Sequence, residues 1–204
     1  MTEEEARLWV RASFGVSRET LLAEFTKLIV EENRRQNLIA PSTVGGLWSR
    51  HIVDSAQLMT LTDRRSGPWL DVGTGGGFPG FVIGCLSDEP IILCEPRRRR
   101  AEFLHQSAVR LGLSHVRVEQ CRVESLPAQI FSVISARAVA ALPGLFEAAR
   151  HVSDRATVWL LPKGKTAREE VAAARKTWHG AFHVEQSLTQ SDSLIVVARG
   201  VARK

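Results

Sequence analysis

The 204-residue chain has no long apolar run and begins with an acidic segment, and both features narrow its class. No stretch approaches the roughly 20 apolar residues that a membrane-spanning helix needs. The first residues, Met-Thr-Glu-Glu-Glu-Ala-Arg, lack the basic start and apolar core of a secretion signal. We therefore expect a cytoplasmic protein with no membrane partner.

The few cysteines and histidines do not form metal-binding patterns. Cys85, Cys94 and Cys121 are 9 and 27 residues apart, so they form no CxxC pair and lack zinc-ligand spacing. The six histidines show no HExxH arrangement. We expect no bound metal, and we expect the cysteines to be small buried side chains in a reducing compartment.

Basic residues are in excess, with a formal net charge of +5 and an isoelectric point of about 9.6. Arginine suits phosphate recognition because its planar fork binds two oxygens at once. A basic surplus is also common in proteins that never touch nucleic acid, so it favours a nucleic-acid partner only modestly. The length and the 44% hydrophobic content are typical of one well-buried α/β domain with a short extension.

Helical patterns fill the start of the chain, and we predict a helical extension over residues 1–65 and one domain over 66–204. Ser17 is the predicted N-cap of a helix. Its apolar residues recur at helical spacing: Leu21, Leu22, Phe25, Leu28 and Ile29. Residues 37–41 end in proline and predict a loop. A second helix is predicted from about Thr43 to Leu61, with Leu47, Ile52, Leu58 and Met59 on its apolar side.

From Pro68 onward, short apolar runs alternate with helical patterns. The predicted strands are Trp69–Val72, Ile91–Glu95, Val116–Glu119, Phe131–Ser135, Thr157–Leu161, His183–Gln186 and Leu194–Ala198. The predicted helices are about Gly80–Leu86, Arg97–Leu111, Leu142–His151 and Thr166–Trp178. This alternation predicts an α/β fold with a doubly wound, mostly parallel sheet. Residues 187–193 are too few for a parallel crossover, so we predict that the last two strands form an antiparallel hairpin.

The first predicted strand runs directly into a glycine-rich loop over residues 73–80. Glycine lets a backbone turn sharply and approach a ligand closely. Pro79 is expected in the first turn of the following helix, where its missing N–H costs nothing. Open α/β sheets bind nucleotides at such strand-to-helix turns. The sequence therefore predicts a nucleotide-type cofactor at this loop.

Two cofactors compete for the loop. Residues 75–80 satisfy GxGxxG, and Glu95 lies 20 residues after Gly75, as an NAD-binding fingerprint requires. Asp71 argues against NAD, because a carboxylate there would repel a pyrophosphate, whereas it suits the cationic amino-acid end of S-adenosylmethionine. Glu95 fits the ribose hydroxyls of either cofactor. We favour S-adenosylmethionine, and a small nicotinamide-binding oxidoreductase is the alternative.

Residues from about 30 to 165 resemble one family closely. The segment Asp-Val-Gly-Thr-Gly-Gly-Gly-Phe-Pro-Gly at 71–80 resembles the signature of bacterial small-subunit rRNA guanine-N7 methyltransferases, the RsmG or GidB family. Other segments match in order: Asn37-Leu38, Arg50–Ser55, Arg99–Leu104, Arg122–Glu124, Ser135–Ala138 and Lys163-Gly164. The resemblance implies a class I S-adenosylmethionine-dependent methyltransferase fold, Rossmann-like, with a seven-stranded sheet whose last strand is antiparallel.

The resemblance also implies an activity and a site. The activity is methyl transfer from S-adenosylmethionine to N7 of a guanine in 16S rRNA of the small ribosomal subunit, at position 527 in the 530 loop. Gly73 and Phe78 would line the cofactor, Val123 and Glu124 would flank its adenine, and Arg137 would lie beside it. The residues themselves add Asp71, Gly75 and Glu95 to this set. No catalytic residue is predicted, because guanine N7 already carries a lone pair and needs no proton removed.

Two polar groups have more than one interpretation. His51, Asp54 and Ser55 share one helical face, and they either anchor the extension to the loop or touch RNA; we favour anchoring. Arg97–Arg100 resembles an RNA grip, but successive helical residues point about 100° apart, so only one or two of the four could meet phosphate. The third functional hypothesis is a non-catalytic RNA-binding assembly factor with a vestigial fold. We expect a monomer whose partner is 16S rRNA.

Overall fold

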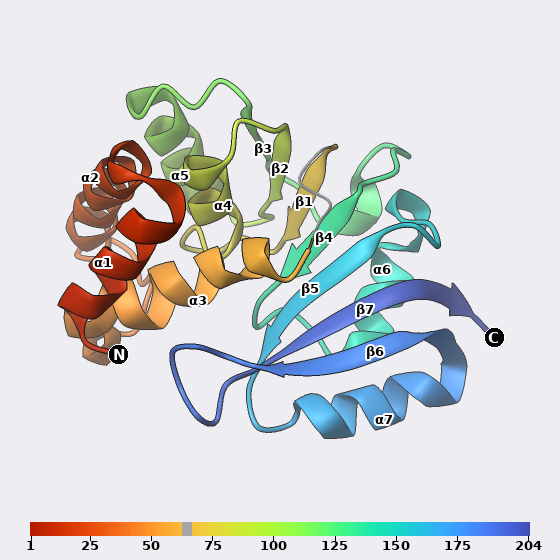
Figure 1. The fold of residues 1–204 in the computed structure, drawn as a ribbon. Coiled ribbons are helices and arrows are strands. Elements are labelled where there is room, and N and C mark those ends of the chain that lie inside the picture. The colour runs from red at the N-terminus through yellow and green to blue at the C-terminus, as the bar shows by residue number, and fades with distance from the viewer. Residues whose placement is uncertain (63–66) are drawn as a thin grey trace.

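The computed structural model describes residues 1–62 and 67–204. Figure 1 shows a twisted sheet with helices on both faces and the N-terminal helices packed at one side, next to α4 and α5. The seven strands have the order β3-β2-β1-β4-β5-β7-β6. The predicted domain boundary at residues 65 and 66 lies outside the described residues, so the division into two parts stays a prediction.

The strand directions confirm the predicted sheet. Neighbouring strands are parallel from β3 (Val116–Glu119) through β2 (Ile91–Cys94), β1 (Trp69–Val72) and β4 (Val133–Ala136) to β5 (Val158–Lys163). The strand β7 (Leu194–Arg203) is antiparallel to both β5 and β6 (Trp178–Gln186). It alone therefore runs against the other six strands.

The final hairpin is longer than predicted. Its pairing extends from Gln186 opposite Leu194 to Trp178 opposite Arg203, with an irregularity between His179 and Ala181. The sequence obscured this extension because β6 is an edge strand in which most side chains between Trp178 and Phe182 are exposed. Pairing with β7, rather than burial, defines that part of the strand.

The helices over the sheet begin and end close to the predicted positions: α4 (Gly80–Leu86), α5 (Arg98–Arg110), α6 (Leu142–Ala148) followed by η5 (Arg150–Val152), and α7 (Ala167–Thr177). Alternate strand residues face two apolar clusters. Trp69 packs with the cluster that contains α4, α5 and the N-terminal helices, whereas Leu70 packs with the cluster that contains α6 and α7. The sheet is therefore covered on both faces.

The N-terminal region differs from the prediction in its caps and helix types. It contains α1 (Glu3–Phe14), α2 (Val16–Glu32), η1 (Pro41–Gly46), η2 (Trp48–Val53), α3 (Asp54–Ala56) and η3 (Gln57–Thr60). Ser17 is not an N-cap: Gly15, with φ 89°, separates α1 from α2, and Ser17 lies inside α2. The predicted helix over 43–61 is helical but changes from 3-10 to π to α and back to 3-10.

A distant carboxylate explains part of that irregularity. Glu3 of α1 accepts hydrogen bonds from the backbone N–H groups of Trp48 and Ser49, both at 2.9 Å. These two N–H groups therefore bond to a side chain that lies 45 residues or more away in sequence. A local helical pattern cannot reveal such a contact.

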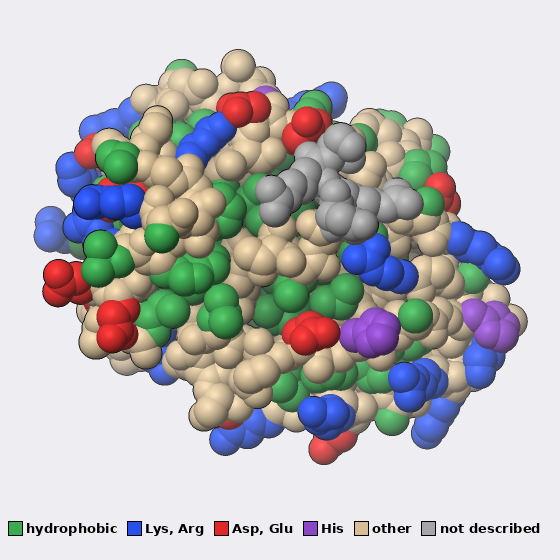
Figure 2. All heavy atoms as spheres, viewed as in Figure 1, with side chains coloured by type: hydrophobic (Ala, Val, Ile, Leu, Met, Phe, Trp, Pro, Cys, Tyr) green, Lys and Arg blue, Asp and Glu red, His purple; other side chains and the backbone are tan. Residues whose placement is uncertain are grey.

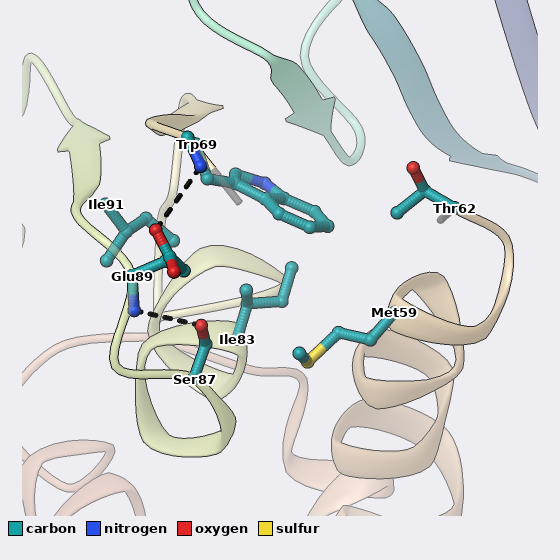
Figure 3. Close-up of a pocket in the computed structure, with 8 residues that line it drawn as sticks. Met59, Thr62, Trp69, Ile83, Ser87, Glu89 and Ile91 are labelled. Atoms are coloured by element: carbon teal, nitrogen blue, oxygen red, sulfur yellow. Dashed lines mark hydrogen bonds between the residues drawn. The ribbon is translucent and has the colours of Figure 1, made fainter. Parts of the chain in front are cut away.

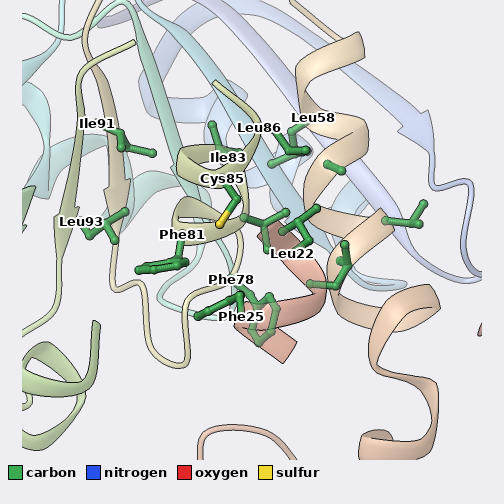
Figure 4. Packing of buried hydrophobic residues seen from close by; sticks show 14 of the residues in the cluster. Leu22, Phe25, Leu58, Phe78, Phe81, Ile83, Cys85, Leu86, Ile91 and Leu93 are labelled. Carbon is green, nitrogen blue, oxygen red and sulfur yellow. The ribbon is translucent and has the colours of Figure 1, made fainter. Parts of the chain in front are cut away.

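The N-terminal helices share one core with the sheet (Figure 4). Phe25 of α2 is fully buried, and its ring stacks on Phe81 of α4 with centroids 4.2 Å apart. It also lies 6.1 Å from the ring of Phe78 and 6.4 Å from that of Phe103. The apolar contacts expected of Leu22, Phe25, Ile29, Ile52 and Leu58 are confirmed by their complete burial.

A small pocket lies at the amino ends of β1 and β2 (Figure 3). Met59, Trp69, Ile83 and Ile91 line it, and its volume is about 20 Å³. That space holds a water molecule but no cofactor. The opposite edge of the sheet, where the parallel strands end, is therefore the place to look for a site.

Among the described helices, none is both long and apolar enough to span a membrane.

Candidate active site

The glycine-rich loop between β1 and α4 uses its backbone N–H groups within the protein. Five of them donate to protein acceptors, namely those of Gly73, Thr74, Gly75, Gly77 and Phe78. The acceptors are the carbonyl oxygens of Cys94 and Thr74 and the side chain of Glu95. Pro79, the N-cap of α4, follows a cis peptide bond and has no N–H. The prediction that Pro79 lies in the first turn of the helix is wrong, because Pro79 precedes the first helical position by one residue.

This geometry does not suit a pyrophosphate. Dinucleotide-binding loops present free N–H groups and a helix N-terminus to the phosphates. Here five of the loop N–H groups are already paired, and two carboxylates, Asp71 and Glu95, lie beside the loop. The NAD interpretation is therefore not favoured, although the GxGxxG spacing allowed it.

Close packing, rather than ligand approach, accounts for much of the glycine content. A Cβ on Gly77, which has φ +107°, would lie 2.5 Å from the ring of Phe25. A Cβ on Gly80 would lie 2.4 Å from the Cβ of Asp71. The loop thus packs closely against α2 and against the end of β1. For Gly77 and Gly80, this packing replaces close approach to a ligand as the reason for glycine.

Asp71 lies at the end of β1 and is completely buried. Its Oδ1 accepts a hydrogen bond of 2.6 Å from the hydroxyl of Ser135 on β4, which itself accepts from the indole N–H of Trp69. Its Oδ2 has no hydrogen-bond partner among residues 1–62 and 67–204. Burial raises the pKa of Asp71 to about 6, against the opposing hydrogen bond from Ser135. The site therefore contains an incompletely compensated negative charge under the glycine loop.

Glu95 follows β2 and connects the glycine loop to α5. Its Oε2 accepts from the N–H of Gly75 and its Oε1 from the N–H of Arg97, both at 2.8 Å. The side chain is buried, with 3% of its surface exposed. Each carboxylate oxygen can accept a further hydrogen bond, so the predicted contact with ribose stays a prediction.

Val123 and Glu124 lie just past the end of β3, in η4 (Val123–Ser125). Val123 is buried and Glu124 is exposed. The parallel pairing of β1 with β2, and of β2 with β3, brings these residues to the same sheet edge as Asp71 and Glu95. The structure thus gathers the predicted cofactor residues of three strands at one edge.

The cysteines are free thiols, of which Cys85 and Cys94 are buried and Cys121 is half-buried.

Arg137 begins the loop after β4 and contacts the N-terminal region. Its Nη2 lies 3.1 Å from Nδ1 of His51, and its Nη1 lies 3.5 Å from Oδ2 of Asp54. Its guanidinium lies 5.1 Å from the ring centroid of Phe78. Burial lowers the pKa of Arg137, and Asp54 opposes that effect; a guanidinium stays charged in any case.

His51 is neutral at physiological pH. Burial, together with the charges of Arg137 and Arg50, lowers the pKa of His51 to about 3. Because Nδ1 accepts from Arg137, Nε2 carries the proton and donates to the hydroxyl of Thr43, 3.0 Å away. The ring therefore has no lone pair left for a proton transfer.

Asp54 joins three parts of the chain. Besides Arg137, it accepts hydrogen bonds from Gln57 and from Ser187 in the β6–β7 loop, each at 3.1 Å. His51 and Asp54 thus anchor the N-terminal region as predicted, but through the loop after β4 and, for Asp54, the β6–β7 loop rather than the glycine loop. The anchoring interpretation is wrong for Ser55, whose hydroxyl donates to the carbonyl oxygen of His51 one turn earlier because it points back along its own helix.

Phe78 occupies a closed environment. Only 4% of its surface is exposed, and its ring centroid lies 4.9 Å from that of His51. Phe25 and Arg137 cover other parts of the ring. Its implied role in lining the cofactor therefore stays a prediction, and the structure assigns the ring itself a packing role.

The four consecutive arginines separate as predicted. Arg98 pairs with Glu102 at 2.7 Å. Arg99 and Arg100 instead donate to the backbone carbonyls of Arg35 and Asn37, at 3.1 and 2.9 Å. Two of the four thus hold the loop after α2. Lys and Arg side chains on the face seen in Figure 2 also form separate groups rather than one patch.

A cleft of about 820 Å³ opens beside Arg137. Its walls come from the N-terminal region, the loop after β4, the end of β5 and the β6–β7 loop; Arg50, Val139, Lys163 and Gln190 represent the four. The volume lies within the usual range for ligand sites. Sequence reasoning missed the contribution of Gln190, because nothing in its short polar loop pointed to a site. Within residues 1–62 and 67–204, no group of His, Cys, Asp and Glu side chains is arranged to hold a metal ion.

Sequence comparison relates the chain to a family over almost its whole length. Residues 18–196 match the family GidB, described as rRNA small subunit methyltransferase G. A protein named ribosomal RNA small subunit methyltransferase G from Novosphingobium aromaticivorans is 46% identical over 209 residues, which cover 100% of this chain and 91% of the relative. A protein of the same name from Zymomonas mobilis is 43% identical and covers 100% and 96%.

Solved structures confirm the fold. A SAM dependent methyltransferase from Aquifex aeolicus superposes with a TM-score of 0.64 at 14% identity, covering 86% of this chain and 98% of that one. The glycopeptide N-methyltransferase MtfA in complex with S-adenosylmethionine gives 0.60 at 13% identity, covering 73% and 93%. The chain thus has the class I methyltransferase fold with a helical N-terminal region.

Proposed function

The chain belongs to the rRNA small subunit methyltransferase G family, and from that premise we propose that it transfers a methyl group from S-adenosylmethionine to N7 of a guanine in 16S rRNA. It does so as a cytoplasmic monomer without a metal ion. The observation that carries this proposal is the glycine loop, five of whose N–H groups are paired internally and whose neighbours are Asp71 and Glu95. Such a loop favours a cationic cofactor over a pyrophosphate.

The residues present fit S-adenosylmethionine. Asp71 supplies negative charge with an unpaired oxygen, and Glu95 can accept from ribose hydroxyls. Gly73, Gly75 and Phe78 belong to the loop that would line the cofactor, Val123 and Glu124 would flank its adenine, and Arg137 would lie beside it. When bound, the cofactor supplies an electrophilic methyl group on a sulfonium.

The protein's part in the reaction is orientation. Guanine N7 is a nucleophile at neutral pH, so no side chain has to remove a proton, which agrees with a His51 whose lone pair is occupied. Holding two reactants in line can contribute up to roughly 7–11 kcal/mol. The target guanine must be unpaired or splayed out, because the deep major groove of A-form RNA hides N7.

The cofactor is tested by calorimetry with S-adenosylmethionine and NAD side by side. We expect saturable binding of S-adenosylmethionine and none of NAD. Gly75→Val should abolish binding, because Gly75 has φ +62° and its N–H is held by Glu95. Gly45→Val, at an open position where a Cβ meets nothing within 4 Å, is the matched control. Binding of NAD alone would make the oxidoreductase the better interpretation.

The acceptor is tested by deleting the gene and cleaving 16S rRNA with borohydride and aniline at 7-methylguanine. We expect one cleavage site to disappear in the deletion strain and to return with the wild-type gene but not with Gly75→Val. If the rRNA keeps every site, the proposal fails. If Gly75→Val instead restores every deletion phenotype without methylation, the protein is an assembly factor.

A further inference from the structure

The cleft beside Arg137 directly adjoins the predicted cofactor loop. Val139 lines the cleft, and its Cγ2 lies 2.6 Å from the position that a Cβ on Gly73 would occupy. Arg137 lines the cleft as well and interacts electrostatically with Asp71. Arg137 and Val139 thus place the cleft next to the edge where β1 ends.

The cleft carries one uncompensated positive charge. Its lining contains three cationic and two carboxylate side chains, of which Arg137 pairs with Asp54 and Lys163 with Glu170, the latter at 2.9 Å. Arg50 is the remaining cation. His51, whose pKa is lowered to about 3, adds no charge at neutral pH.

Arg50 is available to a ligand. It is exposed, and within the described part of the chain it forms no ion pair. Its neighbour is the neutral amide of Gln190, whose oxygen can accept from Nε and Nη2 at 2.9 and 3.0 Å. A neutral partner in an open cleft leaves the guanidinium charge unmatched, and a guanidinium fork suits a phosphate.

The arginines of the α5 segment differ from Arg50 in this respect. Arg98 is neutralised by Glu102, and Arg99 and Arg100 are bonded to backbone carbonyls of the N-terminal region. None of these three lines the cleft. Of these four arginines, Arg50 is therefore the candidate for a phosphate contact in the cleft.

We propose that this cleft receives the splayed-out target nucleotide and that Arg50 contacts a phosphate at or next to it. The inference rests on the proposed function and names the part of the site that holds the acceptor. The cleft volume of about 820 Å³ is sufficient for one nucleotide. Two elements from outside the parallel sheet, the segment around Arg50 and the β6–β7 loop, form the walls and restrict what can enter.

The experiment measures binding of the purified full chain to small ribosomal subunits from the deletion strain over a range of salt concentrations. Arg50→Ala should weaken binding about tenfold and make the slope of log K against log salt shallower by about 0.7, the loss of one phosphate contact to a single strand. Arg50→Lys should keep most of the slope, because it keeps the charge. Arg98→Ala, an exposed arginine outside the cleft, is the matched control and should change neither.

Two further readouts separate this contact from a structural effect. Arg50→Ala should leave S-adenosylmethionine affinity unchanged in calorimetry, and it should raise the KM for subunits while leaving kcat within about twofold. Wild-type slope and affinity in Arg50→Ala, or an equal loss in Arg98→Ala, overturns the inference while methyl transfer by the wild type still supports the proposed function. If the wild type neither binds nor methylates the subunits, both proposals fall together.

Discussion

The two loops that meet at the active edge of the sheet are stabilised in different ways. The loop after β1 packs against Phe25 of α2, but its hydrogen bonds stay within the loop and the end of β2, through the N–H groups of Gly73 and Gly75 and the acceptors Cys94 and Glu95. The loop after β4 is held from far away: Arg137 contacts Asp54 and His51, 83 and 86 residues earlier in sequence.

The backbones of the two loops differ in the same sense. The first loop places glycines at its positive-φ positions, whereas the second has Ala138 at φ 57°. A non-glycine residue in that conformation costs free energy and persists only where its surroundings enforce it. The N-terminal region therefore shapes the loop after β4 through polar contacts, whereas the hydrogen bonds of the loop after β1 come from residues 71–97.

The largest effect should come from Gly77→Ala in the first loop. Alanine would combine an unfavourable φ of +107° with a Cβ 2.5 Å from the ring of Phe25. We expect a loss of about 4 kcal/mol in the free energy of unfolding, from strain and overpacking together. Denaturant unfolding measures it. Gly144→Ala, within α6 and with nothing in 4 Å, is the control and should stabilise by about 0.5–1 kcal/mol; equal losses in both variants would contradict this packing account.

The next largest effect is the pH dependence of folding stability that comes from Asp71, at the start of the first loop. Because the pKa of Asp71 is raised from 3.8 to about 6, its protonated form stabilises the fold, and that contribution is lost as pH rises through about 6. The free energy of unfolding of the wild type, taken relative to that of Asp71→Asn, should therefore fall by about 3 kcal/mol as the pH rises from 3.5 to 7. Urea unfolding at both pH values measures the difference. A difference that does not change with pH would show that Asp71 is not buried as described.

A smaller effect is expected when the second loop loses its anchor. Asp54→Asn removes the negative charge that faces Arg137 and leaves the guanidinium partly buried without it. We expect about 2 kcal/mol of destabilisation, below the figure for a fully buried pair because Arg137 is 22% exposed. A double-mutant cycle with Arg137→Met should show positive coupling. Additive losses would mean that the two side chains act independently.

Within the narrow interval from pH 6.5 to pH 5.5, the smallest effect is the acid sensitivity of His51, which has the opposite sign to that of Asp71. The pKa of His51 is about 3 in the folded protein against 6.5 ordinarily, so the unfolded chain takes up the proton first as pH falls. The free energy of unfolding of the wild type, taken relative to that of His51→Gln, should fall by about 1 kcal/mol as the pH falls from 6.5 to 5.5. Parallel stability curves for the two proteins would contradict the neutral, anchoring role of His51.

The same contrast explains what the sequence could predict. The strand at 69–72, the helix at 80–86 and the loop between them follow from local patterns, namely buried runs and glycines next to each other in the chain. The helix types over 41–60 depend on Glu3, and the position of Asp54 depends on Ser187, 133 residues later. No local pattern records contacts of that range, which is why the irregular helix types were not predicted and Gln190 was missed. The wrong assignments of Ser17 and Ser55 have local causes, since Gly15 caps α2 and the hydroxyl of Ser55 bonds one turn back to His51.

Methyl transfer by the purified protein is the most direct test of the account. Small subunits from the deletion strain are incubated with S-adenosylmethionine labelled in its methyl group, and the RNA is digested to nucleosides. We predict that the label appears in 7-methylguanosine only. Label in another nucleoside, or none with a protein that binds the cofactor, would contradict it.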